Sequence, residues 1–405
     1  MQSVQHLIFK NIPLIIVCLL LVSNQPLIAQ DTKLEMSNLI DKQFKLAEKQ
    51  YQVLAKNTPI GRMPKTYYAK NNKFETSDTK WWCSGFYPGS LLFIYEYTKN
   101  QDVLKEAEKR LASLEKEKHY KGNHDLGFMM YCSFGNAYRL TKSSAYKKTI
   151  DTAAASLATR YRPNAEVIQS WDANKNWKGP VIIDNLMNLE LLMWVAQNGG
   201  DQNYSNIAIN HANATLINHF RPDFSSYHVV DYDMSNGNII KKGTAQGASD
   251  SSAWSRGQGW ALYGYTLMYR FTKDKKYLKM AQNIAKFVLQ HPNLPKDKIP
   301  YWDFNAEGIP NTYRDASSAA VIASALLELG QYTSSKEKKY YASQAREMLV
   351  SLSSSAYTAP EGTNGGFLLK HSMGALPLKS EVDVPLTYAD YYYLEALLRY
   401  KKWYL

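Results

Sequence analysis

The chain has 405 residues, of which 45 % are hydrophobic and 21 % charged, a balance typical of a folded protein with a large core. This composition excludes a disordered chain and a collagen-like repeat. The formal charge of +12 favours an anionic partner and leaves nucleic acid, a membrane surface and acidic sugars open. The 30 tyrosines and 9 tryptophans favour carbohydrate, because their flat amphipathic rings stack on sugar faces.

Residues 1–30 have the pattern of a signal peptide. Lys10 precedes an apolar run over 12–22 that is too short to span a bilayer, and the small residue Ala29 follows. An uncleaved N-terminal anchor is the alternative. Cleavage predicts an exported, periplasmic protein with no membrane segment left. Cys83 and Cys132 would then be its only thiols, and the sequence does not decide whether they pair.

Residues 31–405 are expected to form one all-α domain. Helical periodicity or helix-forming composition predicts twelve segments, at 34–56, 84–99, 101–119, 125–141, 144–161, 182–198, 201–220, 254–272, 274–291, 313–333, 336–354 and 386–402. They make six pairs, and two or three residues join the members of most pairs.

The two helices of a pair differ in character. Segments 125–141 and 313–329 are apolar nearly all round, whereas 101–119 is charged over most of its surface. Because all-round apolar helices lie inside and charged ones outside, the pattern predicts an (α/α)6 barrel of six inner and six outer helices. An open α-solenoid is the alternative, but the pairs lack the self-similar repeat that it requires.

The long loops all precede inner helices. They cover 57–83, 162–183, 221–253, 291–312 and 355–385. We therefore expect them to gather at one mouth of the barrel with the N-termini of the inner helices, whose unpaired N–H groups favour anions.

These loops and helix starts carry the residues that are capable of chemistry. The set is typical of an enzyme that acts on an acidic sugar: it contains two carboxylates, a histidine, a glutamine, an arginine and several tryptophans. The candidate residues are Asp125, Asp184, His228, Gln246, Arg256, Trp260, Trp82, Trp254 and Trp302.

Each candidate also has a structural interpretation. An aspartate at a helix start often only caps the helix, and Arg256 could pair with Asp250. Trp82, Trp254 and Trp302 could pack inside the barrel instead of binding sugar. His211 and His219, on an outer helix, are expected to be structural.

Other signals predict no metal and no cofactor. The segment from Asp231 resembles the start of a calcium loop, but Lys242 stands where a bidentate glutamate is required. Asn236-Gly237 instead predicts a hairpin turn. Zinc, Walker and dinucleotide motifs are absent from the sequence, and the scattered lysines do not form the ordered stripe of a nucleic-acid surface.

Taken together, these segments resemble glycoside hydrolase family 88, the unsaturated glucuronyl hydrolases, over nearly the whole mature chain. The resemblance rests on the order and spacing of four motifs, SGFYPGS at 84–90, HDLG at 124–127, IDN at 183–185 and YYYLEAL at 391–397. It implies an (α/α)6 barrel that releases the 4,5-unsaturated uronic acid from the non-reducing end of lyase products. The loop over 355–385 does not align with the family pattern.

The resemblance also implies roles for single residues. Asp184 matches the catalytic carboxylate and Asp125 the second aspartate. The substrate-binding residues of the family fall on His228, Gln246, Arg256 and Trp260. The implied chemistry is protonation of a vinyl ether, for which Asp184 needs a raised pKa, and we expect Asp125 to supply that shift.

Two other functions stay open from the sequence. One is an unsaturated rhamnogalacturonyl hydrolase on the same barrel, which differs in its contacts to the leaving sugar. The other is a non-catalytic periplasmic glycan-binding protein. The presence of both aspartates favours an enzyme.

Overall fold

The computed structural model describes the backbone from residue 14 and the side chains from residue 33. The predicted signal peptide, residues 1–30, lies outside the residues whose side chains are described. In the part of the chain that the structure describes, no helix is long and apolar enough to cross a membrane.

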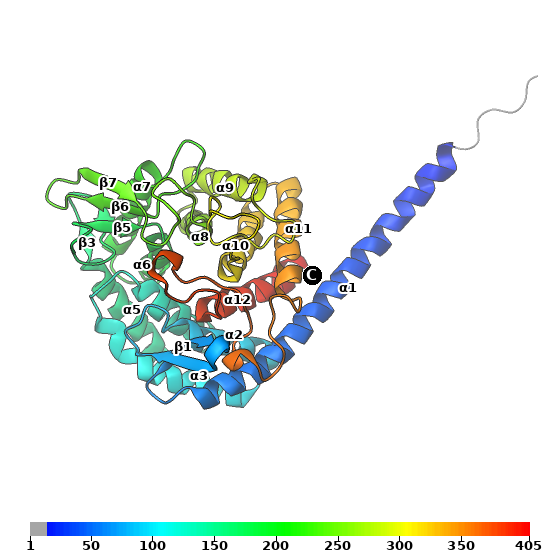
Figure 1. Cartoon of the computed structure of the whole chain (residues 1–405), viewed down its shortest axis with the longest axis horizontal. Coiled ribbons are helices and arrows are strands. Elements are labelled where there is room, and N and C mark those ends of the chain that lie inside the picture. The colour runs from blue at the N-terminus through cyan, green and yellow to red at the C-terminus, as the bar shows by residue number, and fades with distance from the viewer. Residues whose placement is uncertain (1–13) are drawn as a thin grey trace, which may run out of the picture.

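Helices dominate the fold, and each predicted segment is helical (Figure 1). The inner-type helices are α2 (Phe86–Thr98), the π-helix η3 (Gly127–Gly135) with α4 (Asn136–Thr141), α6 (Asn185–Gln197), α8 (Ser255–Thr272), α10 (Ala316–Leu329) and α12 (Thr387–Tyr404). The outer-type helices are α1 (Leu14–Asn57), α3 (Gln101–Leu114), α5 (Ser144–Ala158), α7 (Asn203–Asn218), α9 (Lys275–Gln290) and α11 (Ser335–Leu352).

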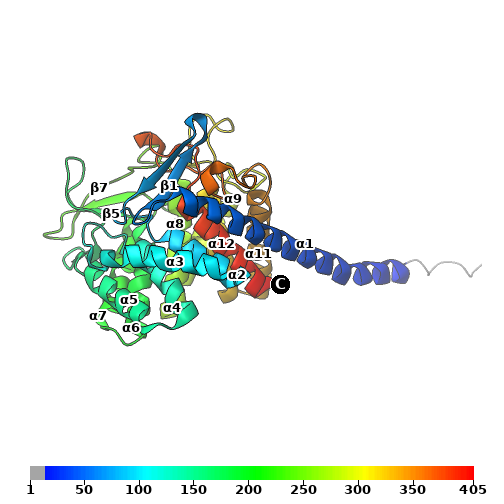
Figure 2. The same ribbon diagram turned by 90° about the horizontal axis from the view of Figure 1, so that it is seen from below.

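The inner helices contact one another in a closed cycle. α2 contacts η3, η3 contacts α6, α6 contacts α8, α8 contacts α10, α10 contacts α12, and α12 returns to α2. Every residue of α10 is buried, as its all-round apolar sequence requires. Figure 1 shows α8, α10 and α12 near the centre, with α9 and α11 outside them. From Met36 onwards, α1 packs beside α2 and α12 (Figure 2).

The fourth predicted segment, 125–141, was expected to be one regular α-helix, and the structure differs. Its first turns over Gly127–Gly135 are widened into a π-helix, and regular α-helix resumes at Asn136. Close contact with α6 accompanies the widening, since the Asn188 amide oxygen accepts the Phe128 N–H at 2.9 Å. A Cβ added at Gly127 would lie 2.4 Å from the Asn188 Cα. Insertions of this kind are frequent near functional sites.

The loops contain short antiparallel strands that the helix analysis did not predict. They are β1 (Met63–Tyr68) with β2 (Lys73–Ser77), β3 (Tyr161–Arg162) with β4 (Val167–Ile168), and a sheet in the order β5 (Pro180–Ile182), β6 (Val229–Tyr232), β7 (Ile239–Gly243). The predicted hairpin at 236–237 is confirmed between β6 and β7. Asp231 accepts the N–H groups of Lys178 and Gly179, so its carboxylate serves the sheet.

This sheet fixes the loop before α6 against the loop before α8. The Ile183 N–H donates to the His228 carbonyl at 3.0 Å, directly beyond the paired residues Ile182 and Val229. The main chain therefore places Asp184 and His228 side by side, although they are distant in the sequence.

Substitution of Gly85 by alanine tests the close approach of α2 to η3. A Cβ there would lie 2.2 Å from the Met129 carbonyl oxygen, and backbone cannot move aside cheaply. We expect Gly85→Ala to lower the free energy of unfolding by roughly 1–3 kcal/mol or more, measured by urea denaturation. Gly259→Ala is the matched control, because its Cβ would meet only side-chain carbons, at 3.2 Å or more. Equal losses in the two variants would contradict the packing described.

Candidate active site

Two carboxyl groups lie at the N-terminal ends of neighbouring inner helices. Asp184 occupies the N-cap position of α6, and Asp125 lies two residues before η3. Asp184 is 7 % exposed, and the side chain of Asp125 is 14 % exposed. The Asp184 Oδ2 atom is buried without a hydrogen-bond partner. A buried, unpartnered carboxyl oxygen is a group to which a ligand can bond.

The pKa values of both carboxyl groups are raised. Burial raises the pKa of Asp184 to about 7, while the Arg256 charge and the Trp260 indole act in the opposite direction. Burial also raises the pKa of Asp125 to about 8, and the charge of Asp184 adds to this shift. The sequence predicted the neighbouring carboxylate as the cause of the Asp184 shift. The structure instead gives loss of hydration as its largest cause.

His228 faces Asp184 with a neutral ring, although the two side chains are too far apart for a hydrogen bond. Its Nδ1 atom accepts the backbone N–H groups of Ala245 at 3.0 Å and Gln246 at 3.2 Å. The ring proton therefore lies on Nε2, which is 3.7 Å from the Asp184 Oδ2. Burial lowers the pKa of His228 to about 3, so the ring stays uncharged at neutral pH.

Arg256 joins three separate segments around the site. It donates to the Asp315 Oδ2 at 3.0 Å, to the Gln246 Oε1 at 3.0 Å and to the Gly374 carbonyl at 2.7 Å. It also bonds the Met373 carbonyl. Its acidic partner is thus Asp315 and not Asp250. Both terminal nitrogens already have protein partners, and the side chain is only 2 % exposed. Arg256 therefore holds other residues of the site in place and has little surface for direct contact with a ligand.

Of the four candidate tryptophans, three are buried in the protein interior and one is partly exposed. Trp260, Trp254 and Trp302 are at most 6 % exposed, which leaves them no free face for a sugar ring. Trp260 packs between the aromatic side chains of η3 and α12, and Trp254 packs against His228. Trp82 is only half-buried, with its ring centroid 4.9 Å from that of Tyr388. Of the predicted tryptophans, Trp82 alone retains an exposed surface.

Three residues near the site were not selected by the sequence analysis. The His124 Nε2 lies 3.3 Å from the Asp125 Oδ1, and burial lowers the pKa of this histidine to about 3. Asp315 holds Arg256. Glu381, from the unaligned loop, is buried with its pKa raised by burial. Two of them had a local signal: His124 is adjacent to Asp125, and Asp315 directly precedes an apolar helix, where a capping residue is expected. Nothing local marked Glu381.

The other two histidines considered in the sequence are structural, and the two cysteines do not form a disulfide. His211 accepts the Ile168 N–H at 3.0 Å, and His219 lies 3.1 Å from the Val181 carbonyl, so both are structural, as expected. Cys83 and Cys132 are free thiols. Among the described residues, no group of three or more histidine, cysteine or acidic side chains is arranged to hold a metal ion.

Replacement of Asp125 by asparagine tests the buried carboxyl group through pH-dependent stability. From its ordinary pKa of 3.8 up to about 8, the folded state keeps a proton that the unfolded state releases. Asp125 therefore stabilises the fold fully below this window and loses that contribution as the pH rises through it. We expect the Tm of Asp125→Asn, relative to wild type, to rise between pH 4 and 8 and then level off. A Tm difference independent of pH would contradict the burial.

Comparison with known proteins identifies the family. Residues 54–403 match the model of Glycosyl Hydrolase Family 88. An unsaturated glucuronyl hydrolase of Formosa agariphila is 43 % identical over 364 residues, which cover 89 % of this chain and 90 % of that protein. A crystal structure of an unsaturated glucuronyl hydrolase specific for heparin is 44 % identical with a TM-score of 0.87, over 90 % of this chain and 97 % of the other.

A third match carries a ligand. It is an aspartate-to-asparagine variant of the Streptococcus agalactiae unsaturated glucuronyl hydrolase, complexed with dGlcA-GalNAc6S. It is 29 % identical, with a TM-score of 0.77 over 90 % of this chain and 92 % of the other. The chain described here belongs to Glycosyl Hydrolase Family 88.

Proposed function

We propose that this chain is an unsaturated glucuronyl hydrolase, which releases the 4,5-unsaturated uronic acid from the non-reducing end of lyase-generated oligosaccharides. The observation that carries the proposal is the buried carboxyl group of Asp184. Its pKa of about 7 keeps a proton available near neutral pH, and its Oδ2 has no protein partner. The names of the relatives described above point to the same reaction.

We further infer that the cycle of inner helices is an (α/α)6 barrel within a single domain, residues 31–405. The contacts that run from α2 round to α12 and back support a closed ring. Asp125 and Asp184 both lie at the N-terminal ends of inner helices, as the loop arrangement predicted for the mouth. Export by a signal peptide over 1–30, to the periplasm, remains a prediction from the sequence.

The mechanism begins with transfer of the Asp184 proton to C4 of the unsaturated ring. Because C4=C5 is part of a vinyl ether, protonation places positive charge on C5 and the ring oxygen. Water then adds at C5 and gives a proton back to the Asp184 carboxylate. The resulting hemiketal opens and expels the leaving sugar. One carboxyl group thus acts first as acid and then as base, and ends in its starting state.

The neighbouring residues make this sequence possible. The His228 Nε2–H faces the Asp184 Oδ2 and can stabilise the carboxylate formed after proton transfer. The charge of Asp184 raises the pKa of Asp125, so Asp125 tends to keep its proton while Asp184 is ionised. Arg256 holds Gln246 and the carbonyls of Met373 and Gly374 in place, so we assign it a positioning role. Trp82 is the candidate platform for a sugar ring.

The two alternatives have less support. The relatives reported above are named for glucuronyl substrates, and none of those three names refers to rhamnogalacturonyl substrates. A glycan-binding protein would have no need for two buried carboxyl groups with raised pKa values in its site.

Asp184→Asn is the direct test of the proton donor. The amide preserves the shape of the side chain but cannot donate the proton, so we expect turnover of an unsaturated disaccharide to fall by about 100-fold or more. Loss of the ultraviolet absorbance of the C4=C5 bond measures turnover. The matched control is Asp172→Asn, because this aspartate lies in the preceding loop with its side chain 77 % exposed. An Asp184→Asn enzyme that keeps more than about a tenth of wild-type activity would exclude the assigned role.

A further inference from the structure

A large cavity lies at the end of the helix cycle opposite to Asp125 and Asp184. Its volume is about 720 Å³, and its lining runs from the C-terminal ends of α2, α4, α6, α8 and α12 inwards to residues of η3, such as Tyr131, and to Tyr391 and Tyr392 near the start of α12. Both site carboxylates lie at N-terminal ends of the inner helices, and no candidate residue of the active site lines this cavity. The volume falls within the range of about 300–1,000 Å³ that is usual for small-molecule sites.

The walls of the cavity are aromatic and only partly buried. The lining rings that are intermediate in exposure are Tyr97, Tyr131, Tyr138, Trp194 and Trp403. Tyr138 and Trp194 meet edge to face with their centroids 5.3 Å apart, which fixes their orientation. Partly exposed, fixed tyrosine and tryptophan rings offer an apolar face and a polar edge to a sugar.

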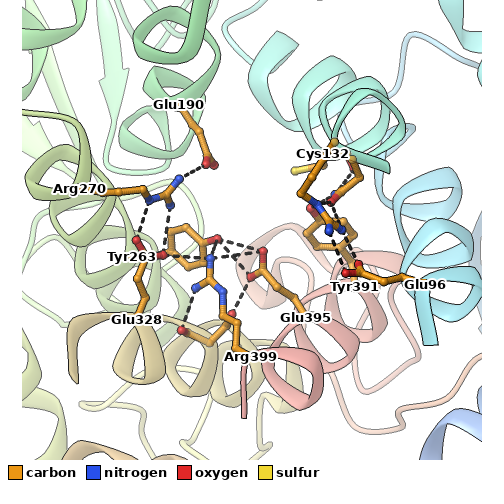
Figure 3. Close-up of polar contacts among 12 residues, drawn as sticks. Glu96, Cys132, Glu190, Tyr263, Arg270, Glu328, Tyr391, Glu395 and Arg399 are labelled. Atoms are coloured by element: carbon orange, nitrogen blue, oxygen red, sulfur yellow. Dashed lines mark hydrogen bonds and ion pairs between the residues drawn. The ribbon is translucent and has the colours of Figure 1, made fainter. Parts of the chain in front are cut away.

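A network of charged side chains forms one side of the cavity (Figure 3). Arg270 pairs with both Glu190 and Glu328, and Arg399 pairs with both Glu328 and Glu395. Although burial acts against it, the two arginines hold the pKa of Glu328 at about 2. The network is therefore fixed before any ligand enters, so binding would cost little reorganisation.

The outer members of this network reach the cavity. The side chains of Arg270 and Glu190 are 27 % and 18 % exposed, and both line it. Glu395 also lines the cavity and accepts the hydroxyl groups of Tyr263 and Ser324. The carboxylate oxygens keep lone pairs that can accept sugar hydroxyl groups, while the Arg270 nitrogens already bond Glu190 and Glu328 and contribute charge.

The rim of the cavity is positively charged. Lys99, Lys142, Lys401 and Lys402 are exposed around it. Among all the lining residues, the basic side chains outnumber the acidic ones by seven to three. An anionic ligand is therefore favoured over a neutral or cationic one.

We propose that this cavity is a second, non-catalytic site that binds an acidic saccharide of the class cleaved at the mouth. Aromatic walls would contact the sugar faces, the preformed network would bond the hydroxyl groups, and the lysine rim would attract the acidic groups. The saccharide class rests on the proposed function, whereas the preference for an anion rests on the cavity alone.

Calorimetric titration of the full-length Asp184→Asn protein with dGlcA-GalNAc6S tests the proposal. Because we expect this variant to turn over the ligand about 100-fold more slowly than wild type, two binding events per chain are expected. Adding the charge reversals Lys142→Glu and Lys402→Glu should abolish one event or weaken it at least 10-fold, and should leave the other unchanged. Both lysines are exposed, so the fold tolerates the changes. The matched control carries Lys116→Glu and Lys339→Glu, two exposed lysines that do not line the cavity.

The outcomes separate this proposal from the proposed function. If only one binding event is seen and the Lys142→Glu and Lys402→Glu changes leave it unchanged, the second site is overturned. It is also overturned if the control changes, Lys116→Glu and Lys339→Glu, weaken binding equally. A single event lost in the rim variant supports the second site and counts against binding at the mouth. Trp194→Ala in the Asp184→Asn background gives an independent check, because it removes a wall without altering charge, and it should weaken the same event as the rim variant.

Discussion

The placement of the Asp184 carboxyl group in a buried position is the constraint on which the proposed chemistry depends. Exclusion of water disfavours the carboxylate form, and this desolvation outweighs the opposing effects of Arg256 and Trp260. The position of Asp184 at the start of α6, within the cycle of inner helices, leaves the residue only 7 % exposed. His228 can remain so close to Asp184 without forming an ion pair because it is buried in the same environment and stays neutral.

Arg256 connects this buried site to the rest of the mouth. Through Asp315 it reaches the start of α10, where the same carboxylate caps the helix by accepting the Ser317 N–H. Through Met373 and Gly374 it holds the loop over 355–385, whose Met373 N–H also donates to Asp315. A buried charge pair of this kind is costly to break from one side, because the partner is left unpaired. The loop that the sequence could not align is thus fixed by Arg256, in the first turn of the eighth predicted helix.

The helices were predictable because helical periodicity is a property of neighbouring residues. Most interactions at the site join residues that are far apart in the sequence, so they leave no such pattern. Periodicity and the contrast between 125–141 and 101–119 are enough to identify helices and to separate inner from outer ones. The π-helix was not predictable, because an all-round apolar segment shows no preferred period. Of the short strands, only the β6–β7 hairpin left a sequence signal, through the Asn236-Gly237 turn. The position at a helix start singled out Asp184, and the resemblance gave it a catalytic role, whereas the Arg256–Asp315 pair spans 59 residues and could not be predicted as a pair.

The position at which water enters the substrate tests the central claim most directly. If Asp184 protonates C4 and then activates water for C5, the anomeric C–O bond is never attacked. Turnover in heavy-oxygen water, with the product sampled before its carbonyl oxygens exchange with solvent, should therefore place the label at C5 of the released keto acid and leave the departing sugar unlabelled. In an ordinary glycosidase, two carboxylates flank the anomeric carbon and water attacks there. Promptly sampled product with label at C1 and none at C5 would contradict the account.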